Sequence, residues 1–105
     1  MVEHKIDFNA LDWQAPGPDA RFKAIAEDHK RIRLMELDKG FQDQVWCEGA
    51  HVGYVIEGEM DIDFGGGEVT RFRTGDGIYI PGGRQHKHKA HVKSDKVRVI
   101  LIEEC

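Results

Sequence analysis

Cysteine is scarce in this chain of 105 residues, which contains two, Cys47 and Cys105. The second is the last residue of the sequence and a poor anchor for a disulfide, and small disulfide-stabilised domains usually carry several bridges. We therefore expect both cysteines to be free thiols rather than parts of a disulfide scaffold.

Long apolar runs and an excess of positive charge are also missing. No run approaches the roughly 20 apolar residues of a membrane-spanning helix, and the N-terminus lacks the apolar region of a secretory signal. Fifteen Lys and Arg against nineteen Asp and Glu give a net charge of −4, the wrong sign for binding nucleic acid through its phosphates. We expect a soluble, cytoplasmic protein without membrane or nucleic-acid partners.

The length allows one domain with a modest core. Twelve glycines separate short runs of β-forming residues, which favours an all-β domain over a helical one. Residues 1–20 show no clear periodicity and contain a Pro-Gly-Pro break at residues 16–18. We interpret residues 1–20 as an N-terminal arm laid over a domain that residues 21–105 form.

The clearest local prediction is a β-hairpin with strands at residues 59–64 and 68–73. The first strand alternates strictly between polar and apolar residues, and three glycines at residues 65–67 supply the turn. Antiparallel pairing across this loop matches charges on one face and apolar side chains on the other: Asp61 with Arg71, Glu59 with Arg73, and Met60 with Phe72.

The last predicted strand, residues 97–102, is apolar on both faces apart from Arg98. Its second face therefore needs a cover, either the N-terminal arm or another subunit. Val52, Tyr54 and Ile56 form a further apolar face. Together these two segments predict a homodimer.

Most of the recognisable information lies in residues 75–88. A short β-forming run ends at the Pro-Gly-Gly of residues 81–83, and two histidines follow, two residues apart. Because side chains alternate across a strand, a strand here would direct His86 and His88 to the same face, on the core side.

The spacing of Gly75, Pro81, Gly83 and His86 resembles the second conserved motif of the cupin superfamily. Ala90 stands where that motif has an Asn.

A stretch upstream resembles the first cupin motif, in which two His one residue apart precede a Glu. Counting back from Gly58 places His51 at the Glu position. Cys47 then takes the second His position and Val45 the first. The stretch is also similar to a subgroup of small single-domain cupins with an Asp-His-Trp-Cys signature, which residues 43–47 keep in part.

The resemblance covers roughly residues 20–104 and implies a jelly-roll β-barrel, mostly antiparallel. Such a fold needs strands in residues 22–37, although apolar residues there also recur at helical spacing. We prefer a hairpin with strands at residues 22–27 and 32–37, joined across residues 28–31, and keep a helix as the alternative.

Four side chains are candidate metal ligands: Cys47, His51, His86 and His88. In an extended segment Cys47 and His51 point to the same side, and antiparallel pairing could bring them to the two later histidines. Thiolate and imidazole donors suit a divalent transition metal, with zinc or nickel favoured and iron a further candidate. Coordination would also remove the cost of about 1–3 kcal/mol of burying an unpaired imidazole.

Each candidate also has a purely structural interpretation. His51 and His86 could be core histidines that hydrogen-bond to a neighbour, and Cys47 a small buried hydrophobe. His88 could hydrogen-bond to a metal-binding side chain without binding the metal itself, or it could contact a substrate. The remaining histidines are interpreted as surface residues: His4, His29 and His91.

We therefore expect a single-domain cupin that binds a transition metal and a small polar molecule in its barrel, with metal-assisted non-redox chemistry such as isomerisation or hydrolysis. A non-catalytic domain that binds a small molecule or responds to metal is one alternative, and a metal-dependent dioxygenase is another. Dioxygen chemistry is less favoured because the matched positions lack a carboxylate and a thiolate is open to oxidation.

Overall fold

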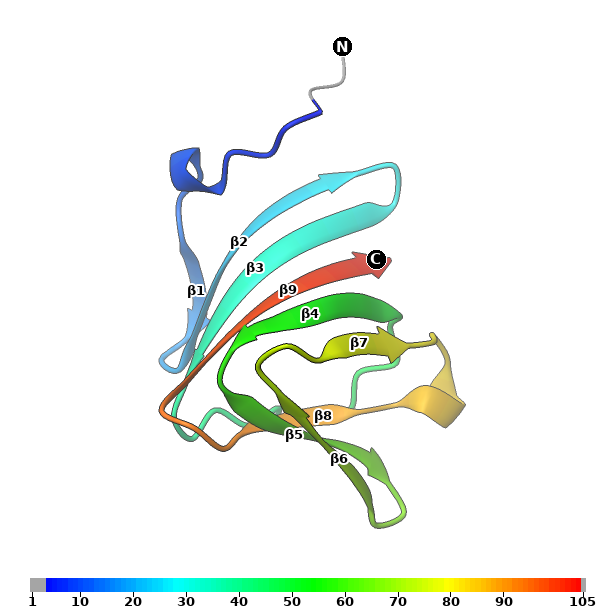
Figure 1. Ribbon diagram of the computed structural model, residues 1–105. Helices are drawn as coiled ribbons and strands as arrows, with labels where there is room; N and C mark the ends of the chain where they lie inside the picture. The colour runs from blue at the N-terminus through cyan, green and yellow to red at the C-terminus, as the bar shows by residue number, and fades with distance from the viewer. Residues whose placement is uncertain (1–3, 105) are drawn as a thin grey trace.

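The computed structural model describes residues 4–104, which form two antiparallel sheets that face one another (Figure 1). The strands in chain order are β1 (Gln14–Gly17), β2 (Ala20–Glu27), β3 (Lys30–Asp38), β4 (His51–Glu57), β5 (Glu59–Gly65), β6 (Glu68–Arg73), β7 (Gly77–Ile80), β8 (Lys89–Val92) and β9 (Lys96–Glu104). Two short 3-10 helices are η1 (Phe8–Ala10) and η2 (Arg84–His86). The predicted fold class, all-β and mostly antiparallel, is confirmed. Cys47 is a free thiol, and Cys105 lies outside the described residues.

The larger sheet has the strand order β1-β2-β3-β9-β4-β7 and the smaller one the order β6-β5-β8. The core lies between them, because alternate side chains of each strand point inward. Its buried members come from both sheets and include Leu37, Val55, Met60, Ile62, Val97 and Val99. Because apolar side chains fill the middle of these inner faces, polar side chains can point inward mainly near the strand ends.

Residues 22–37 form a hairpin and not a helix, as preferred from the sequence. β2 and β3 are longer than predicted, and a turn of two residues joins them instead of four. Asp28 and His29 both adopt positive φ angles, 49° and 64°. Two successive left-handed residues are the mark of the type I′ turn, whose twist matches that of paired strands.

Part of the predicted N-terminal arm belongs to the larger sheet. β1 pairs with β2 and forms the edge of that sheet, while β9 lies three strands away. Within the described residues the arm therefore does not cover the outer face of β9, where Ile102 is 44% exposed. The division of the chain into an arm and a domain at residue 20 stays a prediction.

The hairpin of β5 and β6 has the register predicted from its charges. Glu59 lies opposite Arg73, Met60 opposite Phe72, and Asp61 opposite Arg71. The Arg71 Nε donates to Asp61 Oδ1 over 2.8 Å. Such an exposed pair adds little stability, but a shift by one residue would lose every match at once.

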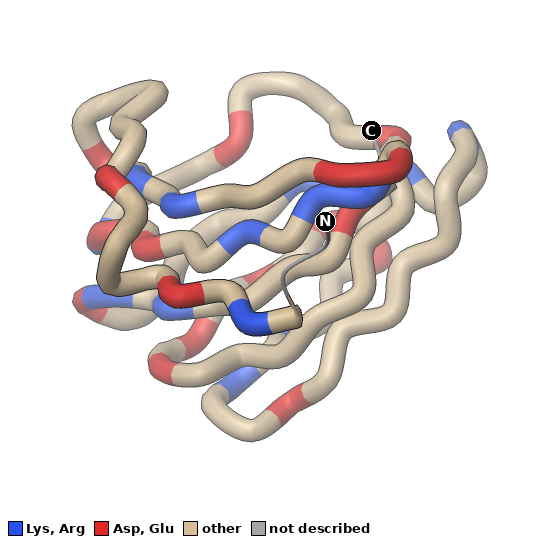
Figure 2. The backbone as a smooth tube through the Cα atoms, turned by 90° about the horizontal axis from the view of Figure 1, so that it is seen from above, with Lys and Arg blue, Asp and Glu red and all other residues tan. Residues whose placement is uncertain are grey.

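Basic and acidic residues are interspersed along neighbouring strands (Figure 2). On the outer face of the larger sheet, Glu36 accepts a hydrogen bond of 2.9 Å from Arg21 Nε and lies 3.0 Å from Arg98 Nε. These charges compensate one another within the chain. Among the described residues, no helix is long and apolar enough to cross a membrane.

Candidate metal centre

Three of the four predicted ligands come together at one point. The donor atoms of Cys47, His51 and His88 all lie within 4.8 Å of one another. Cys47 and His88 are paired across two extended segments, each donating its backbone N–H to the carbonyl of the other over 2.9 Å. His51 opens β4, whose pairing with β7 and β9 positions it beside them.

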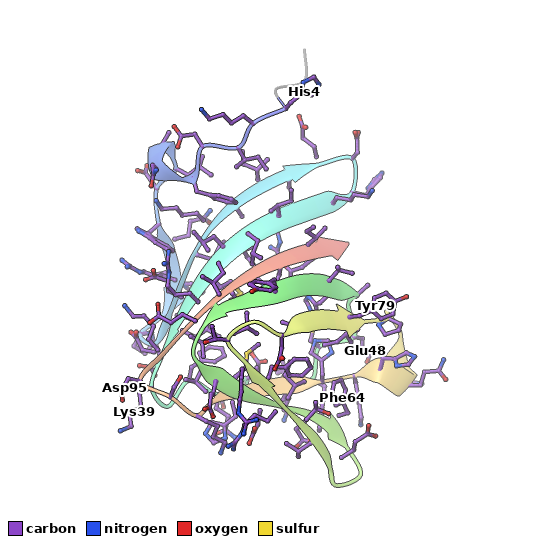
Figure 3. The ribbon with its side chains drawn as sticks, in the orientation of Figure 1. His4, Lys39, Glu48, Phe64, Tyr79 and Asp95 are labelled. Atoms are coloured by element: carbon purple, nitrogen blue, oxygen red, sulfur yellow. The ribbon has the colours of Figure 1, made fainter. Side chains whose placement is uncertain are left out.

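This cluster lies at one end of the barrel. Figure 3 labels Glu48, the neighbour of Cys47, and Tyr79 of β7 at the end of the molecule opposite to Lys39 and Asp95. Phe64 of β5 is on the same side, with its ring centroid 6.4 Å from that of His88. The candidate site is therefore built from strand ends and the loop before β4.

His88 presents a single ring nitrogen to the cluster. Its Nδ1 lies 3.1 Å from the carbonyl oxygen of His86. A carbonyl only accepts, so Nδ1 carries the proton and Nε2 keeps its lone pair. Burial lowers the pKa of His88, and the bond to the His86 carbonyl opposes that shift. The ring is therefore neutral at neutral pH, the state in which it can bind a metal.

His51 is supported from behind by a carboxylate. Its Nδ1 lies 2.9 Å from Oε2 of Glu103, in an electrostatic contact that lacks hydrogen-bond geometry. The ionised carboxylate favours the proton on Nδ1, which leaves Nε2 facing Cys47. The Nε2 atom lies 3.3 Å from the Cys47 Sγ.

Glu103 is deeply buried, with 4% of its side chain exposed. Burial acts to raise the pKa of its carboxyl, but the contact with His51 and the charge of Arg33 outweigh burial and lower that pKa to about 2. Arg33 Nη2 lies 2.8 Å from Oε2, and Arg31 Nη2 lies 3.2 Å from Oε1. Glu103 is therefore a fixed anion that orients His51.

Sequence reasoning missed Glu103, although a signal was present. Glu103 has the same parity as Val97, Val99 and Leu101, so it is the last inward position of an otherwise apolar strand. A charged residue at such a position is rarely buried without partners. That pattern indicates a polar function at the end of β9.

His86 does not join the cluster, and the expected strand at this residue is wrong. Residues 84–86 form η2, so the alternation of side chains that was applied to His86 and His88 begins only after the helix. The His86 side chain lies in a separate hollow with Gln85 and Tyr79. Its contribution to the cluster is the backbone carbonyl that binds His88.

Val45 is also misplaced by the motif alignment. Its side chain is 74% exposed and does not line the cavity. Residues 43–50 contain bends and a single bridge at Cys47 instead of a regular strand, so strand parity does not extend from Cys47 back to Val45.

One pair of the three donors has the spacing of a tetrahedral metal site, and the full set lies within 4.8 Å of one another. Bonds of about 2.3 Å to sulfur and about 2.0 Å to nitrogen would separate two such donors by roughly 3.5 Å. The observed distance between Sγ of Cys47 and Nε2 of His51 is 3.3 Å. Both histidines are also held through Nδ1, which is the arrangement that supports metal-bound imidazoles.

A cavity of about 130 Å³ adjoins the cluster. Its walls are largely apolar and include Met35, Leu37, Met60, Ile62, Ile78 and Ile80. Besides the three donors, Asp43 is its other polar side chain, and Asp43 Oδ2 accepts a hydrogen bond of 2.8 Å from the Ala90 backbone N–H. The donors are therefore the polar end of an apolar chamber.

Comparison with known proteins gives a consistent answer on the fold. A family model described as the cupin domain matches residues 33–103, whereas the curated proteins gave no match. An RmlC-like cupin from Shewanella frigidimarina is 19% identical, with coverage of 98% of this chain and 91% of that chain and a TM-score of 0.79.

Two further solved structures agree with that likeness. KdgF from a Halomonas species is 21% identical, with coverage of 99% and 96% and a TM-score of 0.77. The polyketide cyclase RemF from Streptomyces resistomycificus is 16% identical, with coverage of 99% and 80% and a TM-score of 0.80. At these identities the likeness extends to the fold alone, and it confirms the jelly-roll prediction; the Asp-His-Trp-Cys subgroup stays a prediction.

Proposed function

The chain belongs to the cupin superfamily, and on that premise we propose that it holds a divalent transition metal through Cys47, His51 and His88 and binds a small molecule in the adjoining cavity. The observation that carries this proposal is the convergence of three soft or borderline donors within 4.8 Å of one another. His86, predicted as a fourth ligand, is assigned instead to orienting His88 through its backbone carbonyl.

The donor set favours zinc or nickel, with iron as a further candidate. One thiolate and two imidazoles suit these ions far better than magnesium or calcium, which prefer oxygen ligands. Three protein donors also match the number in catalytic zinc sites, which keep a position for water or substrate. A metal bound here would supply Lewis acidity.

The cavity offers few carboxylates for proton transfer. Within the part of the chain that the structure describes, two lie near the donors. Glu103 is held by Arg33 and His51, whereas Asp43 accepts one hydrogen bond from the Ala90 backbone at Oδ2 and keeps Oδ1 as an acceptor. Asp43 is therefore the one of the two that could take a proton from a ligand, and binding without turnover stays the alternative.

A thermal-shift experiment tests the metal proposal. A ligand that binds the folded state at 100 times its Kd stabilises it by about 2.7 kcal/mol, which raises the Tm of a domain of this size by roughly 10 °C. We expect Zn²⁺ or Ni²⁺ to produce such a rise, and Mg²⁺ to produce none. A Tm that no transition metal changes would contradict the proposal.

We further propose that the chain forms a homodimer through the outer face of its larger sheet. Cross-strand pairing aligns one apolar row over five strands of this face: Ile25, Ile32, Ile102, Val52 and Tyr79. On the same face, the row of Arg21, Glu36 and Arg98 holds one carboxylate between two arginines and has a net charge of +1. The row of Lys23, Leu34 and Ile100 separates it from the apolar row, so a second copy can cover the apolar row while the two charged rows stay apart.

A further inference from the structure

We propose that the cavity takes a small monoanion with an apolar body about the size of one ring and a single metal-binding head, such as a carboxylate, and that it discriminates against polyhydroxylated molecules. The proposal rests on the metal site described above. It revises the expectation of a small polar ligand.

The walls of the cavity determine the body of the ligand. Met35 and Leu37 of β3 face Met60 and Ile62 of β5 across the chamber, and Ile80 of β7 adds to the same lining. These side chains offer no hydrogen-bonding groups beyond a thioether sulfur, which is a weak acceptor. A ligand body within reach of these walls gains from apolar contact.

The polar groups of the chamber are too few for a ligand with several hydroxyls. Asp43 accepts from the Ala90 backbone at Oδ2, which leaves Oδ1 for one ligand hydroxyl, and the Nδ1 atoms of His88 and His51 face the His86 carbonyl and Glu103. Each hydroxyl buried here without a partner would weaken binding about tenfold or more. The cavity therefore selects against sugar-like molecules.

The volume limits the size of the body. The cavity measures about 130 Å³, close to an engineered aliphatic cavity of about 150 Å³ in another protein that admits benzene. A single ring or a short aliphatic chain fits inside, and a longer molecule would have to extend beyond the chamber.

The charge of the site determines the head. A divalent ion with the Cys47 thiolate and two neutral imidazoles has a net charge of +1. The Asp43 carboxylate in the cavity wall adds −1. Glu103 together with Arg31 and Arg33 adds +1, so the site as a whole keeps a net charge of +1. A buried positive charge is costly unless it is paired. A singly negative head that binds the metal would neutralise it.

Calorimetry on the zinc-loaded protein tests the proposal with three probes. Benzoate has the proposed body and head, galacturonate has the same head on a polyhydroxylated body, and benzyl alcohol has the same ring without the charge. We expect benzoate to bind at least tenfold more tightly than either of the others. Binding of galacturonate as tight as that of benzoate, or no binding of benzoate, would overturn the proposal.

A wall variant adds a second readout. Met35→Gln places an amide of similar size in the partly buried wall. We expect this variant to bind benzoate more weakly and to show a smaller ratio of benzoate affinity to galacturonate affinity. Val69→Gln, on the exposed strand β6, is the matched control. An affinity ratio that stays the same in Met35→Gln would contradict the proposal that this wall contacts the apolar body of the ligand.

Metal content separates this proposal from the one on which it rests. Zinc that is retained while galacturonate binds best would leave the metal site standing and overturn the ligand class. A protein that retains no zinc would overturn the metal site. Benzoate that binds equally well before and after zinc is removed would overturn the role of the head group, while leaving the metal site and the apolar body standing.

Discussion

Glu103 orients His51: its carboxylate lies 2.9 Å from Nδ1, so that Nε2 of the ring faces the Cys47 thiol at 3.3 Å. His51 lies well inside the predicted domain and Glu103 near its C-terminal end, and the two lie side by side because β4 pairs with β9. The positions aligned with the metal-binding motif contain no carboxylate. Glu103 supplies one next to the site, where it orients His51 instead of binding the metal itself.

Replacing Glu103 should weaken metal binding. We predict that Glu103→Gln lowers zinc affinity by about 10–100-fold, since a metal-bound His loses affinity on this scale when its supporting carboxylate is removed. Competition with a chelating dye measures the change. Glu36→Gln, which alters another buried carboxylate, on the outer face, should leave the affinity unchanged. Equal effects of the two variants on affinity would contradict the role of Glu103.

Val45→His should not add a ligand. The side chain at this position is 74% exposed and outside the cavity, so we predict zinc affinity within error of the unmodified protein in the same dye assay. A clear increase in affinity would show that Val45 turns inward when metal is bound, as the motif alignment had implied.

Part of the acid sensitivity of the fold should depend on Glu36. Burial acts to raise the pKa of its carboxyl, but the bond to Arg21 and the charges of Lys96 and Arg98 outweigh burial and lower that pKa below 4.5. The stabilisation from this group is therefore complete above pH 4.5 and is lost as the pH falls through the folded-state pKa.

Urea unfolding at several pH values tests this prediction. Glu36→Gln should reduce the loss of stability below pH 4.5, whereas Asp95→Asn, at a carboxylate that is 96% exposed, should leave it unchanged. The same acid dependence in Glu36→Gln and the unmodified protein would contradict the prediction.

The outer-face dimer should be sensitive to a single charge. We predict that Ile102→Glu, in the middle of the apolar row, converts a dimer into a monomer, because an unpaired buried carboxylate in an interface is strongly unfavourable. Val69→Glu changes an exposed valine on the smaller sheet and should leave the mass unchanged. Light scattering measures the mass of each protein. A monomeric mass for the unmodified protein would contradict the proposed homodimer.

The sequence predicted well wherever the local pattern and the pairing partner were close together. The register of β5 and β6 followed from alternation and charge matching across a short glycine turn, and the structure confirms it. The hairpin of β2 and β3 was also predicted correctly, because a jelly roll needs strands there. The predicted turn of four residues was too long, since single-sequence patterns locate strand ends poorly.

The site was harder to predict because it depends on irregular backbone and distant pairing. His86 failed as a strand residue because η2 interrupts the strand before His88. Val45 failed because the segment before β4 bends instead of alternating. Glu103 lies 52 residues from His51 in the sequence, and only the pairing of β4 with β9 shows that they meet.

Cobalt substitution tests the central claim, the metal site of Cys47, His51 and His88, most directly, because a thiolate ligand gives Co²⁺ a charge-transfer absorption that imidazole and carboxylate ligands do not. We predict about one Co²⁺ per chain with that absorption, its loss in Cys47→Ala, and its retention in His86→Ala, which keeps the backbone carbonyl that positions His88. A protein that binds no cobalt, or one whose thiolate absorption persists in Cys47→Ala, would contradict the claim.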